Sequence, residues 1–181
     1  MTGLTCLLGE PALSDFRASK LRETIAAGTG AEVRISARYC FLVEHAERLT
    51  DHDTEVLQGL LQAEKVSELE EQGLALITPR VGTISPWSSK ATDIARHCGL
   101  DRVARVERGW AFRISPMPED DFRKASLVDC LHDRMTQSVL FRLQDARLLF
   151  EHHSARSLVR VPLGREGRPA LERINIELGL A

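Results

Sequence analysis

The sequence predicts an α+β fold, built as a tandem ferredoxin-like repeat in which antiparallel sheets carry helices on one face and a linker segment follows. Apolar and polar residues alternate over residues 33–43 and 103–111, which is typical of half-buried strands. Helix start signals follow a short apolar run in each half of the chain. Three pairs of like residues are each 70 positions apart: Lys20 and Lys90, Val33 and Val103, and Arg38 and Arg108.

The sequence of the first half of the chain predicts four elements in the order short strand, helix, long strand, helix. The apolar run at residues 2–8 ends in a glycine and a proline, which favours a strand. Ser14 is a suitable N-cap for a helix that reaches about residue 27, where two glycines follow. The alternating segment 33–43 predicts a long strand, or two strands joined by a bend, and residues 50–53 resemble a capping box that begins the second helix.

The second half predicts the same order. Residues 74–78 form a short strand, and Ser85 followed by a proline begins a helix that reaches Cys98. Residues 103–111 form the second long strand. From about residue 119, apolar residues recur every three or four positions and predict one long amphipathic helix that ends at His152 and His153. The apolar stripe of this helix consists of Leu127, Leu131, Met135, Val139, Leu143, Ala146 and Phe150.

These patterns divide the chain into two regions. Residues 1–153 form one domain whose pseudo-repeats, about 1–70 and 71–153, make a pseudo-twofold unit. Residues 154–181 are a linker and the start of the next region, because residues 164–169 are polar and rich in turn formers. The last four residues are apolar or glycine, so we expect the chain to be a fragment of a longer polypeptide.

Composition argues against several functional classes. The 181 residues include 24 basic and 26 acidic side chains, so no overall basic charge favours a nucleic-acid partner. Aromatic residues make up 5% of the chain, which is few for an RNA-binding module. The sequence has no signal peptide and no apolar run long enough to span a membrane. Its four cysteines are widely spaced, which argues against a metal site and favours reduced thiols in the cytoplasm.

The segment from Thr78 to Lys90 is the candidate site. Its hydroxyl groups and cations, together with a helix N-terminus, suit a phosphate or a carboxylate, although no Walker A loop is present. The alternative is that Ser85 and Pro86 only begin a helix, while Trp87 packs in a core or an interface. The candidate residues are Arg80, Gly82, Thr83, Ser85, Trp87, Ser88, Ser89 and Lys90.

No set of residues predicts a catalytic or metal centre. The six histidines are not paired with carboxylates or thiols at the spacing of metal ligands. Neighbouring helical residues such as His97 and Cys98 point about 100° apart, which is poor geometry for a catalytic dyad. The sequence also contains no Gly-x-Ser-x-Gly motif. We therefore expect this segment to be non-catalytic by itself.

The segment Thr78–Asp93 (TPRVGTISPWSSKATD) resembles the N-terminal region of the large, single-chain phosphoribosylformylglycinamidine synthase, also called formylglycinamide ribonucleotide amidotransferase. Val81 stands where many relatives have proline, which is a conservative difference. Shorter resemblances run almost from end to end of the chain: residues 9–14 with Lys20 and Leu21, 106–109, 131–135 and 177–181.

This resemblance implies an N-terminal domain similar to a dimer of the small PurS-type subunit of the split enzyme, which agrees with the repeat. The family enzyme is an ATP-dependent ligase of purine biosynthesis that converts formylglycinamide ribonucleotide and glutamine to formylglycinamidine ribonucleotide. The resemblance implies that the ATP and Mg²⁺ ligands and the glutaminase nucleophile lie beyond Ala181, so this segment binds no cofactor. Its expected partners are the synthetase and glutaminase domains of the same polypeptide, and the isolated fragment could self-associate.

We therefore expect the domain to dock the synthetase and glutaminase parts and to support ammonia transfer, with Thr78–Lys90 on the face toward the synthetase site. A second hypothesis remains open. In it, the chain is a self-contained enzyme module that binds a phosphate or another anion through the Thr78–Lys90 loop.

Overall fold

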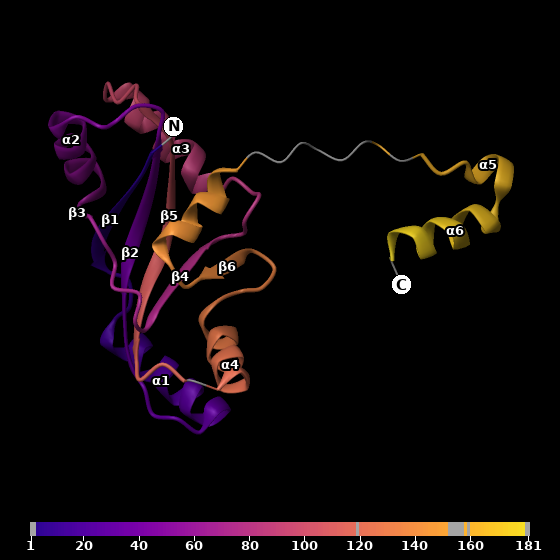
Figure 1. Cartoon of the computed structure of the whole chain (residues 1–181), viewed down its shortest axis with the longest axis horizontal. Helices are drawn as coiled ribbons and strands as arrows, with labels where there is room; N and C mark the ends of the chain where they lie inside the picture. The colour runs from indigo at the N-terminus through magenta and orange to yellow at the C-terminus, as the bar shows by residue number, and fades with distance from the viewer. Residues whose placement is uncertain (1–2, 119, 152–157, 159, 180–181) are drawn as a thin grey trace.

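The computed structural model describes residues 3–118, 120–151, 158 and 160–179 (Figure 1). In chain order the elements are β1 (Gly3–Pro11), α1 (Asp15–Thr29), β2 (Arg34–His45), α2 (Asp51–Leu61), β3 (Glu64–Val66), β4 (Leu74–Pro79), α3 (Pro86–His97), β5 (Val103–Ser115), α4 (Asp121–Leu131), β6 (Gln137–Leu140), the 3₁₀ helix η1 (Leu143–Phe150), α5 (Leu163–Glu166) and α6 (Arg168–Leu178). Within these described residues, no helix is long and apolar enough to cross a membrane.

The strands form one antiparallel sheet in the order β3-β1-β2-β5-β4-β6. This order is symmetric about the pair β2–β5, because each half of the chain contributes one long inner strand and two strands outside it. The inner pair runs from Arg34 opposite Ser115 to His45 opposite Val103. The α+β class is therefore confirmed, and the sheets of the two halves are joined into one.

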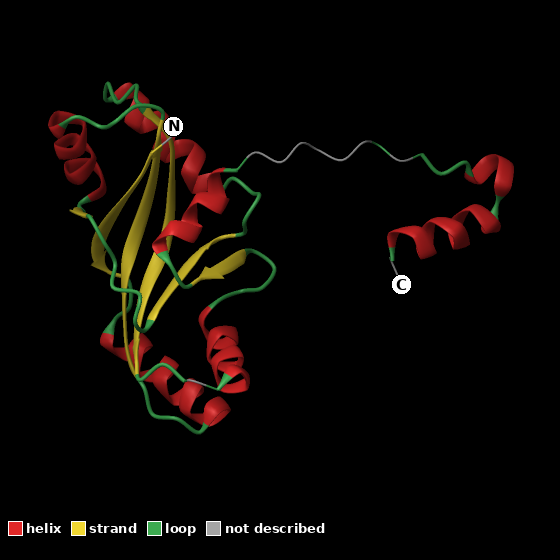
Figure 2. Cartoon of the chain, in the orientation of Figure 1, coloured by secondary structure: helices red, strands yellow, loops and turns green. Residues whose placement is uncertain are grey.

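Helices α1 to α4 cover one face of this sheet, α2 beside α3 and α1 beside α4 (Figure 2). Side chains from α2 and α3 pack on Phe41 and Val43 near one end of β2. Side chains from α1 and α4 pack on Ile35 and Ala37 near its other end. Successive residues of a strand point to opposite faces, so these odd-numbered β2 residues all lie on the helical face. The expected placement of helices on one face is confirmed for α1 to α4.

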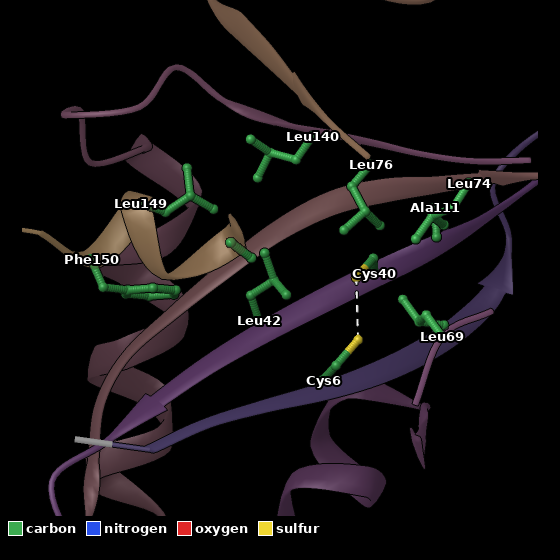
Figure 3. Close-up of a cluster of buried hydrophobic side chains, with 11 residues drawn as sticks. Cys6, Cys40, Leu42, Leu69, Leu74, Leu76, Ala111, Leu140, Leu149 and Phe150 are labelled. Carbon is green, nitrogen blue, oxygen red and sulfur yellow. Dashed lines mark hydrogen bonds between the residues drawn. The ribbon is translucent and has the colours of Figure 1, made fainter. Parts of the chain in front are cut away.

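The opposite face is covered largely by η1. The core there joins Cys40 and Leu42 of β2 with Leu76 of β4 and with Leu149 and Phe150 of η1 (Figure 3). Leu69, from the connection between β3 and β4, closes the same cluster. The sheet is thus buried on both faces, which explains why β4 is an almost continuous apolar strand.

The prediction of a single long helix after residue 119 is wrong. Helix α4 ends at Leu131, since His132 adopts extended backbone angles and Asp133 forms a turn. The Asp133 carboxylate accepts hydrogen bonds from the Met135 N–H at 2.8 Å and the Thr136 hydroxyl at 3.1 Å. The chain then forms β6 and η1. The predicted stripe is split between two cores, because Leu127 packs on the helical face and Phe150 on the other. The predicted end at residues 152–153 lies outside the described residues.

The helix start signals are confirmed. The Ser14 and Ser85 hydroxyls accept hydrogen bonds from the backbone N–H of the third residue of α1 and of α3, at 3.4 and 3.0 Å. Thr50 and Asp53 form the expected capping box, and Asp120 caps α4. Thr50 and Asp120 are again 70 positions apart, which fits the repeat.

The C-terminal region contains α5 and α6, which pack against each other. Helix α6 begins with a proline in its first turn, Pro169. The predicted domain boundary at residue 153 lies outside the described residues, so the division into residues 1–153 and 154–181 stays a prediction.

Candidate functional site

The Thr78–Lys90 segment leaves the end of β4, passes the edge of β5 and enters α3. Strand β4 pairs with β5 as far as Ile77 opposite Trp110, and its last two residues pair only with β6. The edge of β5 beyond Trp110 is therefore open to other partners. On this edge the Val106 N–H donates to the Thr92 hydroxyl of α3 at 3.0 Å. Helix α3 thus replaces the missing strand.

A buried ion pair anchors the segment to β5. Glu107 is completely buried and pairs with the guanidinium of Arg105. Its carboxylate also accepts hydrogen bonds from the Ser85 N–H at 3.2 Å and the Ser85 hydroxyl at 2.8 Å. Arg105 in turn donates to the carbonyl of Thr83 at 2.8 Å and to that of Leu149 at 2.9 Å. The carboxylate has enough partners to tolerate burial, and the pair fixes the loop against both β5 and η1.

A tight turn shapes the exposed part of the segment. Gly82 has a φ angle of 83°, a left-handed conformation that glycine adopts without strain. The Thr83 hydroxyl donates to the Arg80 carbonyl at 2.6 Å, and the Arg80 N–H donates to the Thr136 carbonyl at 2.9 Å. The Val81 N–H donates to the Ser138 hydroxyl at 3.2 Å. The turn is thus held by its own hydroxyl and by the chain around β6.

These contacts leave a cavity of about 590 Å³, the loop cavity, between the segment, the central strands and the turn before β6. Arg80 and Arg108 both line it, and the residues that line it include no aspartate or glutamate. The Arg108 guanidinium lies 4.9 Å from the ring centroid of Trp87 and 5.5 Å from that of Tyr39. Its lining residues are Ile77, Thr78, Pro79, Arg80, Thr83, Ile84, Ser85, Pro86, Trp87, Arg108, Gly109, Trp110, Met135, Thr136 and Gln137. Two guanidinium groups and several hydroxyls suit an anion or an acidic surface.

The structure brings four of the eight candidate residues together at this cavity: Arg80, Thr83, Ser85 and Trp87. Gly82 shapes the adjacent turn and does not line the cavity. Trp87 is half-buried and lies 5.8 Å from Phe41, centroid to centroid. Ser85 and Pro86 begin α3, as the alternative interpretation expected. The same residues therefore have a structural role and also line a cavity.

The other three candidates lie on α3, away from the cavity lining. Ser88 is fully buried, and its hydroxyl has no hydrogen-bond partner among the described residues. Ser89 and Lys90 are exposed. Lys90 lines a separate, mostly apolar cavity of about 290 Å³ between α2 and α3. Lys90 therefore does not join Arg80 and Arg108, the two cations of the loop cavity.

Sequence reasoning did not assign Arg105, Glu107, Arg108 or the residues 135–137 to the candidate site. A signal for the first two was present. Arg105 and Glu107 occupy alternate positions of a predicted strand, so they share one face, and a charged pair on a largely apolar strand predicts a buried ion pair. Residues 135–137 could not be found, because the single long helix predicted there placed them far from the motif.

The arrangement contains no recognisable catalytic centre. Among the residues that the structure describes, no group of three or more histidine, cysteine, aspartate or glutamate side chains could hold a metal ion. The His97 ring bonds to the carbonyl of Asp93 at 2.7 Å and forms no dyad with Cys98. The cavity can bind or position a group. The Ser85 hydroxyl bonds to the Glu107 carboxylate, but that carboxylate is also paired with Arg105 and anchors the loop.

Comparison with known protein families gives a match that includes the candidate site. The family described as "Formylglycinamide ribonucleotide amidotransferase N-terminal" matches residues 38–150, which is more than half of the chain. The match contains the whole Thr78–Lys90 segment, the ion pair of β5 and the turn before β6. The resemblance drawn from the sequence is confirmed: the chain belongs to the family of formylglycinamide ribonucleotide amidotransferase N-terminal domains.

Proposed function

We propose that this domain docks the synthetase and glutaminase parts of the purine-biosynthesis ligase and supports the transfer of ammonia between them. The observation that carries the proposal is the cavity built from the Thr78–Lys90 segment. It concentrates two cations and several hydroxyls without a catalytic set. Such a surface is suited to position an acidic or phosphate-bearing group that belongs to another part of the enzyme.

Ammonia transfer gives a reason for a docking domain. Ammonia released by a glutaminase must reach the synthetase site without protonation or loss to water, which requires a sealed interface. Helices α1 to α4 on one face of the sheet offer a broad surface for such an interface. The loop cavity lies at the start of α3, next to Gly109 and Trp110 of β5. In this proposal the cavity faces the synthetase site.

The reaction itself would take place elsewhere in the full-length polypeptide. We propose that ATP and Mg²⁺ bind to the synthetase part, since Mg²⁺ prefers carboxylate and phosphate oxygens and the lining of this cavity has no carboxylate. The proposed setting is the cytoplasm, with other domains of the same enzyme as partners and with no nucleic acid. The present segment would contribute positioning and leave the chemistry of the C–N ligase to those domains.

The test is substitution of cavity residues in the full-length enzyme. Arg108→Ala and Trp87→Ala remove the cation and its aromatic support, and we expect the glutamine-dependent rate to fall about tenfold, equivalent to about 1.4 kcal/mol of lost positioning. The ammonia-dependent rate should fall as well if the cavity faces the synthetase site. Arg17→Ala, which removes an exposed arginine from α1, is the matched control. Unchanged rates with unchanged stability in both cavity variants would refute the proposal.

The second candidate function is a self-contained anion-binding module, favoured by the two arginines in a cavity without carboxylates. Calorimetry of the isolated 181-residue chain with ATP and with formylglycinamide ribonucleotide separates the two functions. Saturable binding that is lost in Arg108→Ala would favour the module. No binding of either compound, together with the kinetic defect in the full-length enzyme, would favour the docking domain.

A further inference from the structure

Two buried cysteines lie side by side on the sheet face that η1 covers (Figure 3). The sulfur atoms of Cys6 and Cys40 are 3.5 Å apart, although the residues are 34 positions apart in sequence. Cys6 is paired with Leu42 and Cys40 with Leu8, so the cysteines are diagonal neighbours on adjacent antiparallel strands. This contact depends on the register of β1 and β2.

We propose that Cys6 and Cys40 form a modification site at which a small hydroperoxide converts the thiol pair into a reversible disulfide. The pair does not line the loop cavity and has no part in the proposed docking function. The inference therefore stands independently of that function. At rest both thiols are reduced, as is usual in the cytoplasm.

A cavity gives a small oxidant access to one of the two sulfurs. It has a volume of about 410 Å³ and lies between β1, the connection after β3 and η1. Cys6 lines this cavity and Cys40 does not. The charged side chains that line it are Glu68, Glu71 and Arg147. A hydroperoxide that enters the cavity would therefore meet Cys6 first.

The environment of Cys40 assigns it the second step. Its hydrogen bond with Cys6 and its burial raise the pKa of the Cys40 thiol well above the ordinary value, so its thiolate is scarce. The Cys6 thiolate attacks the terminal peroxide oxygen and the O–O bond breaks. The other oxygen takes up a proton and leaves as an alcohol, or as water where the oxidant is hydrogen peroxide. Cys6 is then a sulfenic acid, oxidised by two electrons.

The second step closes the disulfide. The Cys40 sulfur attacks the Cys6 sulfur, the S–O bond breaks, and the hydroxyl leaves as water with the proton of the Cys40 thiol. Overall, two thiols and one hydroperoxide give one disulfide, one water and one alcohol, or two waters where the oxidant is hydrogen peroxide. The sulfurs must close from 3.5 Å to about 2.05 Å, a shift of about 1.5 Å that side-chain rotation and a small strand movement can supply.

The other two cysteines differ from this pair in their surroundings. Cys98 is exposed, and the Cys130 thiol donates to the Ser126 carbonyl at 3.3 Å. Neither has a second sulfur in contact within the part of the chain that the structure describes. A sulfenic acid on Cys98 has no resolving thiol and proceeds to the sulfinic acid or to links between molecules. Only Cys6 and Cys40 combine burial with a neighbouring thiol at high effective concentration.

The test uses the full chain with Cys98→Ser and Cys130→Ser, which leaves the buried pair intact. After treatment of the folded protein with hydrogen peroxide, we expect the mass to fall by two hydrogen atoms. Tryptic digestion should then give the segments Met1–Arg17 and Tyr39–Arg48 as one linked species. Dithiothreitol should restore both free thiols.

Cys40→Ala in the same background is the matched control, with its fold checked by circular dichroism. Cys6 should then gain oxygen and form no link within the molecule. The proposal is overturned if both thiols of the intact pair stay free after an exposure that fully oxidises Cys98 in the natural sequence. It is equally overturned if Cys6 gains oxygen while Cys40 stays reduced, or if the link forms only in the denatured chain.

Discussion

At the scale of single residues, the domain depends on a few buried charges that have several partners each. Glu107 is the clearest case, because it is completely buried and joins the candidate segment to β5 through Ser85 and Arg105. Breaking a buried pair costs more than the pair contributes, since the remaining charge is left without compensation. Such residues therefore fix the geometry of the loop more than they add to overall stability.

From the surroundings of the Asp53 carboxyl we predict that the free energy of unfolding depends on pH. Its carboxylate accepts the Thr50 N–H at 2.8 Å and contacts Arg102 at 3.3 Å, and these contacts, the Thr50 bond above all, lower the pKa of Asp53. A lowered folded-state pKa stabilises the fold above the unfolded pKa of about 3.9, and this stability is lost as the pH falls through the folded value. We expect Asp53→Asn to cost about 1 kcal/mol at neutral pH and to flatten the acid side of the stability curve.

The measurement for Asp53 is denaturant unfolding at a series of pH values from neutral to strongly acidic. Asp51→Asn is the control, because Asp51 lies in the same first turn of α2 but is exposed. An Asp53→Asn curve parallel to that of the natural sequence over the whole range would contradict the assignment.

At the scale of elements, the close approach of β4 to β5 requires a glycine. A Cβ atom at Gly109 would lie 2.4 Å from the carbonyl oxygen of Ile77, which is too close for any backbone to tolerate unmoved. Gly109→Ala should therefore push β4 from β5 and destabilise the domain by about 1–3 kcal/mol. Gly59→Ala should do the opposite, because nothing lies within 4 Å and alanine favours a helix interior by about 0.5–1 kcal/mol.

Guanidinium chloride unfolding of the two glycine variants and the natural sequence tests this pair of expectations. The midpoints should move in opposite directions with unchanged m-values, since the same surface is exposed on unfolding. A stabilised Gly109→Ala protein would show that the two strands are not held as closely as the structure indicates.

Elements with local start signals were predictable from the sequence, and elements defined by distant contacts were not. Ser14, Thr50 and Ser85 each cap a helix within three residues, so the signal and its effect are adjacent. The prediction for the region after Leu131 was wrong because the structure there depends on contacts between residues far apart in the sequence. Leu140 faces the η1 side of the sheet and Leu127 the helical side, and only the tertiary structure separates them. Only part of the cavity lining was predictable from the sequence. The Thr78–Lys90 motif is local, whereas Arg108 and the residues 135–137 come next to it only when the sheet forms.

At the scale of the whole molecule, the sequence offset of 70 has a structural counterpart at the centre of the sheet. The offset maps Tyr39 onto Gly109 and Cys40 onto Trp110. In the sheet, Tyr39 lies opposite Trp110 and Cys40 lies opposite Gly109. The four residues therefore surround the position at which a twofold axis would cross the pair β2–β5. Gly109 and Trp110 also line the loop cavity, so the candidate site begins where the two halves meet.

This symmetry predicts that the two halves can assemble from separate chains. A break between Ser67 and Glu68, both exposed, leaves β1 to β3 on one chain and β4 to η1 on the other. Each half exposes the apolar edge of its long strand, so neither should fold stably alone, whereas the pairing of residues 34–45 with 103–115 should restore the domain when both are present.

We expect coexpressed halves 1–67 and 68–151 to copurify as a one-to-one complex with the circular dichroism of the uncut chain. Val43→Asp in the first half, which places a charge opposite buried Val106, should abolish the complex. Stable folding of either half as a monomer would contradict the prediction, because the twofold contact would then not be needed to complete the core.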